Sequence, residues 1–478
     1  MSPEKHLLDW QISQTIAETI SPLLGQLYRE KGVEVLLFGK TLVNAATIDI
    51  IKTHRLARRY TGTPLSTEQT FPLIKALSEM ELSPCRVDIG QLAHQFWKGR
   101  DDDYGIKDFL HTALLGAMNG ETVSEPRDVV LYGFGRIGRL LTRLLIEKNG
   151  PGYPLRLRAV VVRGGKKGDL EKRASLLRRD SVHGQFNGSI IVDEERKAII
   201  ANGNYIQFIY ANKPEDVDYT KYGINGALIV DNTGVWRDSQ ELGQHLECNG
   251  AEKVLLTAPG KGDIKNIVFG VNENTIQPQD TIISAASCTT NAITPVLKAV
   301  NDKYGVASGH IETVHSFTND QNLIDNFHSG ERRGRSASLN MVLTSTGAAK
   351  AVAKALPELA GKLTGNAIRV PTPNVSMAVA NLNLEKITDK DELNAYLREI
   401  ALKSELSAQI DYTESTEVVS TDLVGSRFAG VVDGAATIAQ DKRCVLYIWY
   451  DNEFGYSCQV IHCMEQMMGV RYKTYPNV

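Results

Sequence analysis

DVVLYGFGRIGRLLTRLLIEK, residues 128–148, is the stretch that decides the fold of most of this chain. It opens with an apolar, β-branched run that predicts a buried strand, and it ends with leucines at helical spacing. Gly133, Gly135 and Gly138 stand between these two parts in the pattern GxGxxG. Glycine permits a tight turn and lets another group approach the backbone closely. The stretch therefore predicts a strand, a turn and a helix whose N-terminus faces a bound phosphate.

This turn suits a dinucleotide, because free backbone amides and the positive end of the helix dipole favour a pyrophosphate. An ordinary glycine-rich turn is the alternative interpretation, and the strand before the turn and the helix after it count against that alternative. We expect five residues of the turn to contact a nicotinamide dinucleotide, NAD or NADP: Gly133, Gly135, Arg136, Ile137 and Gly138.

The end of the second predicted strand bears on the choice between NAD and NADP. Enzymes that prefer NAD usually place an acidic residue there to bind the ribose hydroxyls. This chain has the sequence RGGKK instead, and we expect Arg163 and Gly164 to lie at the ribose. The positive charge of Arg163, Lys166 and Lys167 would suit the 2′-phosphate of NADP, although a solvated basic turn explains the same residues equally well. Both cofactors stay open, and we favour NADP.

Short β-branched runs and helical segments alternate after residue 128. The runs that we expect to form strands are VVLYG, LRAVVV, ALIVDN, KVLLTA and TIISAA. The connections between them are long enough for crossover helices, which parallel strands require. This part of the chain is therefore predicted to be an α/β fold with a doubly wound parallel sheet.

The first 125 residues show a different pattern. Apolar residues recur at helical spacing near the N-terminus, and Ser66–Gln69 and Asp88–Gln91 match the capping box that begins a helix. The charged segment ETVSEPR, residues 121–127, contains a proline, as linkers often do. We therefore predict an all-α N-terminal extension over residues 1–125.

The composition argues against several classes of protein. The chain has 53 basic and 56 acidic residues and a net charge of −3, which gives no electrostatic reason to expect a nucleic acid or a membrane as partner. The opening segment MSPEKHLLDWQ carries charges where a signal peptide needs an apolar run. Six cysteines are scattered with no CxxC pair, which argues against a disulfide framework or a zinc site. We therefore expect a cytoplasmic protein without a metal.

Cys288 stands in SAASCTTNAITPVLKAV, where a strand-like run gives way to apolar residues at helical spacing. This pattern places the thiol at the start of a helix. The partial positive charge there, together with a nearby imidazole, would lower the pKa of the thiol and make it a nucleophile. A cysteine taken alone is more often a small buried apolar residue, so its neighbours have to decide.

Six segments resemble, in the same order, the motifs of the glyceraldehyde-3-phosphate dehydrogenase family. They are GFGRIGR (133–139), SCTTN (287–291), TVHSFT (313–318), STGAAK (345–350), RVPTPNVS (369–376) and WYDNEFGYS (449–457). The resemblance covers about residues 127–478. It implies a Rossmann-type NAD(P)-binding domain over 126–287, an α+β catalytic domain over 288–453, a segment 454–478 that returns to the NAD(P)-binding domain, and a homotetramer.

The resemblance also implies a reaction, the reversible phosphorylating oxidation of glyceraldehyde 3-phosphate to 1,3-bisphosphoglycerate. Cys288 is expected to attack the aldehyde, and His315 to accept a proton and ease hydride loss to NAD(P). Inorganic phosphate then attacks the resulting thioester and releases the acyl phosphate. Such a reaction serves glycolysis in one direction and gluconeogenesis or other biosynthesis in the other.

Roles for the polar residues of the motifs follow from the same resemblance. Asn452 is expected to orient the nicotinamide. Other residues expected at the cofactor are Thr233, Gly234, Thr257 and Ala258. The substrate phosphate is expected at Thr318 and Arg369, and the attacking phosphate at Ser287, Thr289, Thr346 and Gly347.

Two departures from the common family pattern keep alternatives open. Ala292 replaces a second cysteine that many members carry, so no disulfide can form across that helical turn. The loop 318–337, with Arg332, Arg333 and Arg335, is similar to that of photosynthetic and erythrose-4-phosphate-oxidising relatives, and in the family it reaches a neighbouring subunit's cofactor. The alternatives are an erythrose-4-phosphate dehydrogenase, and a regulatory binding protein that retains the fold.

Overall fold

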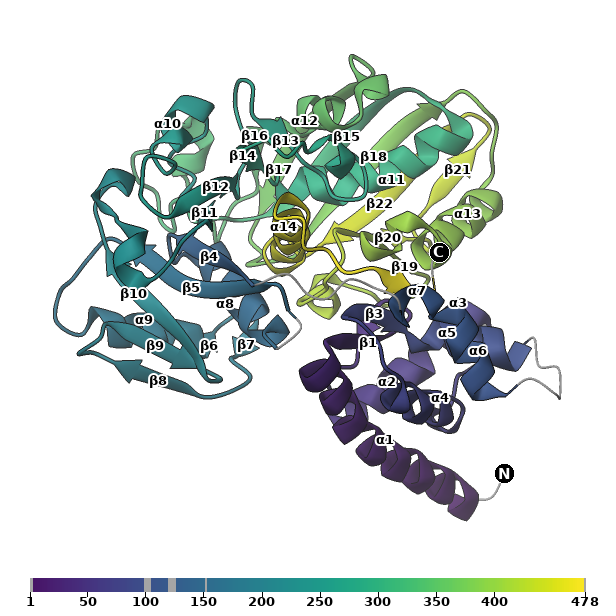
Figure 1. Cartoon of the computed structure of the whole chain (residues 1–478). Helices are drawn as coiled ribbons and strands as arrows, with labels where there is room; N and C mark the ends of the chain where they lie inside the picture. The colour runs from purple at the N-terminus through teal and green to yellow at the C-terminus, as the bar shows by residue number, and fades with distance from the viewer. Residues whose placement is uncertain (1–2, 99–104, 119–125, 151–152, 477–478) are drawn as a thin grey trace. The chain divides into compact units, whose positions relative to one another are not determined.

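The chain forms two compact units in a computed structural model that describes residues 3–98, 105–118, 126–150 and 153–476 (Figure 1). The first unit takes its described residues from 1–126, 148–154 and 470–478, and the second from 127–147 and 155–469. Most of the predicted boundary segment, residues 121–125, lies outside the described residues. Within them, no helix is both long and apolar enough to cross a bilayer.

Helices surround a small sheet in the first unit, with α1 packed against α2 and α4. The helices are α1 (Pro3–Lys31), α2 (Thr47–Leu56), α3 (Arg58–Thr61), α4 (Thr67–Glu79), α5 (Ile89–Lys98), α6 (Ile106–Ala113) and α7 (Leu115–Met118). The predicted capping box of Ser66 and Gln69 is confirmed at the start of α4. Asp88, the residue before α5, caps that helix in a similar way: its carboxylate accepts a hydrogen bond from the Gln91 amide at 3.1 Å.

The prediction of an all-α extension was wrong in one respect, because the first unit also contains a sheet of order β2-β1-β3-β23. Its strands are β1 (Val33–Leu37), β2 (Lys40–Thr41), β3 (Cys85–Asp88) and β23 (Thr474–Tyr475). The side chains of Val33, Val35 and Val87 are fully buried, so these short apolar runs form the core as strands.

The C-terminal segment also differs from the expectation. Residues 454–478 were predicted to return to the cofactor-binding domain, and α14 (Phe454–Met467) does lie in the second unit. The prediction was wrong for the described residues from 470 to 476, because β23 pairs in parallel with β3 of the first unit. This pairing satisfies backbone groups of β3, and Tyr475 joins the apolar core of the first unit.

A nine-stranded sheet in the second unit confirms the predicted α/β class. Its order is β13-β14-β12-β11-β4-β5-β10-β9-β8, with all pairs parallel except those of β8 and β9. The strands are β4 (Arg127–Tyr132), β5 (Leu155–Val162), β8 (Ile190–Asp193), β9 (Ala198–Ala201), β10 (Asn204–Tyr210), β11 (Ala227–Asp231), β12 (Ala251–Leu256), β13 (Lys265–Asn266) and β14 (Ile282–Ser284). The connecting helices are α8 (Arg136–Lys148), α9 (Asp169–Arg178) and α10 (Ser239–Gly243).

The order of this sheet reverses at β4, which has β5 on one side and β11 on the other. In a doubly wound sheet, ligands bind at such a reversal, outside the carboxyl ends of the strands. A separate ribbon of β6 (Arg179–Asp180) and β7 (Gly184–Gln185) follows α9. The fold thus directs attention to the residues that follow β4, β5, β11 and β12.

A mixed sheet of order β16-β17-β15-β18-β22-β20-β19, with β21 beside β22, forms the second sheet of this unit. Its strands are β15 (Val306–Ser316), β16 (Val342–Ser345), β17 (Leu363–Val370), β18 (Ser376–Leu384), β19 (Ile410–Thr413), β20 (Gly430–Asp433), β21 (Ile438–Gln440) and β22 (Arg443–Tyr450). Helices α11 (Cys288–Tyr304), α12 (Ala348–Ala355) and α13 (Lys390–Lys403) accompany it, and α11 lies along the sheet in Figure 1. The predicted α+β character is confirmed.

Candidate active site

The turn after β4 has the geometry that a pyrophosphate requires. Gly133 has a φ of 101°, which L side chains rarely adopt, and α8 begins at Arg136. A Cβ at Gly138 would lie 2.3 Å from the Gly133 carbonyl oxygen, so only glycine fits there. A Cβ at Gly135 would meet no atom within 4 Å, which leaves the backbone open to a bound group. The turn therefore fits a dinucleotide.

Residues after β11 and β12 meet this turn at the same edge of the sheet. A Cβ at Gly133 would lie 3.2 Å from Cγ2 of Thr233, and Gly234 follows in the same loop. The Thr257 hydroxyl donates to the Asp231 carbonyl oxygen at 3.0 Å, and Ala258 accepts a hydrogen bond from Ser284. The structure therefore places Thr233 beside the glycine turn, and Thr257 beside the end of the neighbouring strand β11.

A buried pair of Asp231 and His245 underlies this edge, and sequence reasoning missed it. Both side chains are fully buried, and His245 Nε2 lies 3.0 Å from the Asp231 carboxylate. The other carboxylate oxygen accepts hydrogen bonds from the amide and the hydroxyl of Thr233 at 2.8 and 2.7 Å. The pair therefore holds the start of the loop that carries Thr233.

The basic turn after β5 is exposed, as a cofactor contact would require, from Arg163 to Lys167. The structure adds an acidic residue that the sequence pattern did not reveal. The Asp169 carboxylate reaches the turn, where a Cβ on Gly164 would lie 3.3 Å from it. This carboxylate is paired with Arg173 at 2.7 Å, and Arg173 also donates to the Arg163 carbonyl oxygen. Charges of both signs therefore lie at the expected ribose position.

Cys288 begins α11, as predicted, because Ser287 caps the helix by accepting a hydrogen bond from the Thr290 amide at 3.1 Å. The chain enters the helix through Ala286, whose φ of 54° is unusual for a residue with a side chain. Strained backbone of this kind often marks a functional turn. Cys288 as a residue is only partly buried.

His315, near the end of β15, faces this thiol. Its Nε2 lies 3.6 Å from Cys288 Sγ, and its side chain is buried. Its Nδ1 lies 2.7 Å from the Ser316 carbonyl oxygen and 2.6 Å from Nη1 of Arg369. The structure therefore brings together Cys288, His315 and Arg369, three residues that the sequence predicts at the active site.

The electrostatics of the pair differ from the expectation. Burial raises the pKa of the Cys288 thiol, although the charge of Arg369 and hydrogen bonds at the helix start oppose this effect. The prediction that the helix N-terminus would lower the pKa of Cys288 was wrong, because the effect of burial is larger. Burial and the Arg369 charge lower the pKa of His315 to about 4. Burial therefore disfavours the charged form of both groups.

Thr318 and Arg369, expected at the substrate phosphate, share a neighbour that sequence reasoning missed. The Thr318 hydroxyl donates to the Asp320 carboxylate, which also pairs with Arg333 at 2.9 Å. Burial would raise the pKa of Asp320, but the Thr318 hydroxyl and the charge of Arg369 lower it. This places an anion beside the expected phosphate position.

The residues expected at the attacking phosphate are less closely connected. Thr289 is buried, with its hydroxyl 2.9 Å from that of Tyr450. Thr346 and Gly347 lie at the start of α12, where the Thr346 hydroxyl accepts from the Ala348 amide at 3.2 Å. Helix N-termini favour anions, so α11 and α12 both offer a position for a phosphate.

Asn452 is connected through Ser376 to the strand β15, which carries His315. The Ser376 hydroxyl donates to the Asn452 side-chain oxygen at 2.8 Å and accepts from the Ser316 amide at 3.1 Å. Ser316 directly follows His315 in β15. The residue expected to orient the nicotinamide is therefore tied to the strand that carries the imidazole.

Two family models match this chain. Residues 127–239 match the NAD-binding domain of glyceraldehyde 3-phosphate dehydrogenase, and residues 287–452 match its C-terminal domain. The chain belongs to the glyceraldehyde-3-phosphate dehydrogenase family. It is therefore an oxidoreductase with a domain for a nicotinamide cofactor.

Relatives of the chain fall into two groups by length. A Pseudomonas aeruginosa UCBPP-PA14 protein named glyceraldehyde-3-phosphate dehydrogenase-like is 61% identical over 95% of this chain and 99% of its own length. The glyceraldehyde-3-phosphate dehydrogenase of Zymomonas mobilis is 37% identical over 71% of this chain and 98% of its own length. The chloroplastic GAPA1 enzyme of Arabidopsis thaliana is 40% identical over 74% of this chain and 87% of its own length. The Pseudomonas relative therefore shares most of the N-terminal extension.

The three arginines of the loop from Thr318 to Ala337 differ in their ion pairs and exposure. Arg333 pairs with Asp320, and Arg335 pairs with Asp325 at 2.7 Å, whereas Arg332 is exposed. In this member of the family, two of the three charges are thus partly neutralised within the loop itself. The loop, the residues that follow it and the strand β16 expose large apolar side chains, namely Leu323, Ile324, Phe327, Leu339, Met341 and Leu343.

Proposed function

We propose that the chain catalyses the reversible phosphorylating oxidation of glyceraldehyde 3-phosphate to 1,3-bisphosphoglycerate. The observation that carries this proposal is the 3.6 Å contact between Cys288 Sγ and His315 Nε2 at the start of α11. A nucleophile and a base at this distance support attack on an aldehyde with concerted removal of the thiol proton. The family assignment supports the substrate class.

The neutral state of the pair supports a concerted first step. Sulfur bonds to the aldehyde carbon while the thiol proton moves to Nε2 of His315, and His315 then returns this proton to the former carbonyl oxygen, so the product is a neutral hemithioacetal and His315 is again free to act as a base. This requires the imidazole to carry its own proton on Nδ1, where the Ser316 carbonyl oxygen can accept it. Arg369 disfavours that tautomer through its contact with Nδ1. A substrate phosphate that draws the guanidinium away would favour it.

A bound nicotinamide dinucleotide supplies the hydride acceptor for the second step. Asn452, held by Ser376, orients the carboxamide, and His315 takes the hydroxyl proton of the hemithioacetal so that a thioester forms. The helix starts at Cys288 and Ala348 then offer backbone amides to inorganic phosphate, which attacks the thioester. The thiolate leaves and is reprotonated, and the acyl phosphate departs.

We favour NADP over NAD as the cofactor. The exposed charges of Arg163, Lys166 and Lys167 support recognition of a 2′-phosphate, and Asp169 is already paired with Arg173. The ratio of kcat/KM for NADP to that for NAD tests this preference. A ratio above one agrees with it, and a ratio well below one assigns the turn to solvent instead.

A homotetramer is the assembly that we propose. Phe327, 92% exposed, and its apolar neighbours on the loop support burial of this loop against another subunit, because monomers rarely expose contiguous apolar patches. Sedimentation or light scattering of the purified protein measures the assembly directly. A monomer at micromolar concentration would contradict it.

Purified protein, assayed with both candidate sugar phosphates and with or without inorganic phosphate, tests the reaction. We expect cofactor reduction that requires phosphate and is faster with glyceraldehyde 3-phosphate. The loop 318–337 favours erythrose 4-phosphate as the second candidate, and faster oxidation of that sugar phosphate without a phosphate requirement would select it. No reduction with either substrate would instead select a regulatory binding protein.

A further inference from the structure

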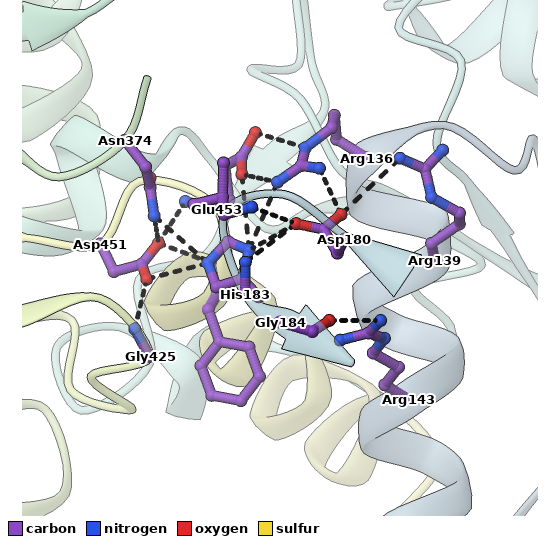
Figure 2. A network of polar contacts seen from close by, with 12 residues as sticks. Arg136, Arg139, Arg143, Asp180, His183, Gly184, Asn374, Gly425, Asp451 and Glu453 are labelled. Atoms are coloured by element: carbon purple, nitrogen blue, oxygen red, sulfur yellow. Dashed lines mark hydrogen bonds and ion pairs between the residues drawn. The ribbon is translucent and has the colours of Figure 1, made fainter. Parts of the chain in front are cut away.

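A buried polar network joins the dinucleotide turn to the segment that carries Asn452 (Figure 2). It begins at Arg136, the first residue of α8, whose guanidinium forms ion pairs with Asp180 and Glu453. The same guanidinium lies 3.3 Å from Nδ1 of His183. The Arg136 side chain, which is 24% exposed, thus has three partners within the protein.

His183 is the central member of this network. Its side chain is 3% exposed, and Nε2 lies 3.1 Å from the Asp451 carboxylate. An imidazole with its proton on Nε2 donates to Asp451 and accepts from Arg136 at Nδ1, which satisfies both nitrogens. Asp180 fixes the backbone around it by accepting hydrogen bonds from the amides of Val182 and His183 at 3.0 and 2.9 Å.

Asp451 links His183 to the segment that carries Asn452. Its carboxylate accepts hydrogen bonds from the amides of Glu453 and Phe454, which begin α14, from the Gly425 amide, and from the side chain of Asn374. These contacts measure 2.8 to 3.0 Å, and the side chain is fully buried. The carboxylate therefore fixes the backbone that directly follows Asn452.

We propose that His183 and Asp451 are positioning residues that set the place of Asn452 relative to the dinucleotide turn. The inference rests on the proposed function, in which Asn452 orients the nicotinamide for hydride transfer. Because His183 bonds to Arg136 on one side and to Asp451 on the other, a displacement at one end reaches the other through two contacts. Loss of His183 loosens the nicotinamide and leaves the Cys288–His315 pair in place.

Two substitutions of one residue separate positioning from general stability. The side-chain nitrogen of glutamine reaches the position of Nε2, so His183→Gln keeps the hydrogen bond to Asp451. Asparagine is too short, so His183→Asn loses it. His310→Gln is the matched control, because His310 bonds only to exposed side chains of Thr364 and Asn366.

The readout is the primary deuterium isotope effect on cofactor reduction, measured with deuterium at the aldehyde carbon. A misplaced nicotinamide slows hydride transfer, so His183→Asn should raise the isotope effect and lower kcat about 10- to 100-fold. His183→Gln and His310→Gln should resemble the wild type. The alkylation rate of Cys288 by iodoacetamide should be equal in all four proteins.

A smaller folded fraction lowers the rate but leaves the isotope effect unchanged, so misfolding cannot imitate the expected result. An isotope effect in His183→Asn equal to that of the wild type overturns the inference and leaves the proposed function intact. A wild type that transfers no hydride from either sugar phosphate overturns the proposed function instead.

Discussion

At the scale of single residues, the proposed reaction depends on a thiol and an imidazole whose charged forms are disfavoured by burial. Burial raises the pKa of Cys288 and lowers that of His315, so an ion pair between them is disfavoured. A neutral pair needs proton transfer during attack, and the 3.6 Å separation allows it. The reactivity of Cys288 therefore belongs to the pair and not to the cysteine alone.

Replacing Cys288 by serine should abolish the thioester and leave cofactor binding nearly unchanged. An alcohol is a far weaker nucleophile than a thiol, and Cys288→Ser alters one atom at the helix start. Mass spectrometry after mixing with aldehyde and cofactor detects the thioester. The control is Cys248→Ser, since the Cys248 thiol donates to the Pro214 carbonyl oxygen at 3.1 Å and a hydroxyl can do the same. Normal turnover in Cys288→Ser would refute the assignment.

Because of Asp180, the free energy of unfolding should fall as the pH is lowered into the acid range. Burial would raise its pKa, but hydrogen bonds from the His183 amide and from Arg136 outweigh burial and lower the pKa to about 2. The ionised carboxylate therefore contributes up to about 2 kcal/mol above pH 5, and this contribution is lost as pH falls through 3.8 towards 2.

Asp180→Asn cannot ionise, so the variant should be less stable than the wild type at pH 6, and the difference should shrink at pH 3. The free energy of unfolding in urea, measured at both values of pH, decides this. A difference that stays constant between pH 6 and pH 3 would show that the charge of Asp180 contributes nothing.

At the scale of elements, the sequence allowed prediction where local chemistry determines the structure. The glycines around Gly135 and the capping serine before Cys288 each act within a few residues, and both elements form as predicted. The strands β1 and β3 were missed because such short apolar runs resemble helix segments until a partner strand is known. The Asp231–His245 pair and the His183 network join distant residues, so no local pattern indicates them.

The turn between β4 and α8 supports a sharp prediction about one methyl group. Gly138→Ala would place a Cβ 2.3 Å from the Gly133 carbonyl oxygen, so the turn must open. We expect cofactor affinity to fall at least about tenfold, because the backbone amides lose their alignment with the pyrophosphate. Titration with NAD or NADP by calorimetry measures this change.

Gly243→Ala is the matched control for that substitution, because a Cβ at the end of α10 would meet no atom within 4 Å. Its cofactor affinity should equal that of the wild type. An unchanged affinity in Gly138→Ala would mean that the turn adapts without cost, and the case for this turn as the pyrophosphate site would be lost.

At the scale of the whole molecule, the N-terminal extension is completed by the other end of the chain. The strand β23 pairs with β3, and the amide of Arg86 donates to the Lys473 carbonyl oxygen at 2.9 Å. A relative from Pseudomonas aeruginosa shares 61% identity over 95% of the chain, so this arrangement is open to comparison in a second protein. We therefore expect the stability of the first unit to depend on the C-terminal strand.

Tyr475 gives this idea its most direct test, because the side chain is 5% exposed and belongs to the apolar core of the first unit. Tyr475→Ala should lower the free energy of unfolding of that unit by about 3 kcal/mol, as expected for a truncated buried aromatic ring. Hydrogen exchange of the amides of β1 and β3 should become faster, whereas the amides of β15 and β22 should keep their protection. The control Tyr205→Ala removes a ring that is 44% exposed in the second unit and should change neither set. Unchanged exchange in β3 after Tyr475→Ala would mean that the first unit folds without the C-terminal strand.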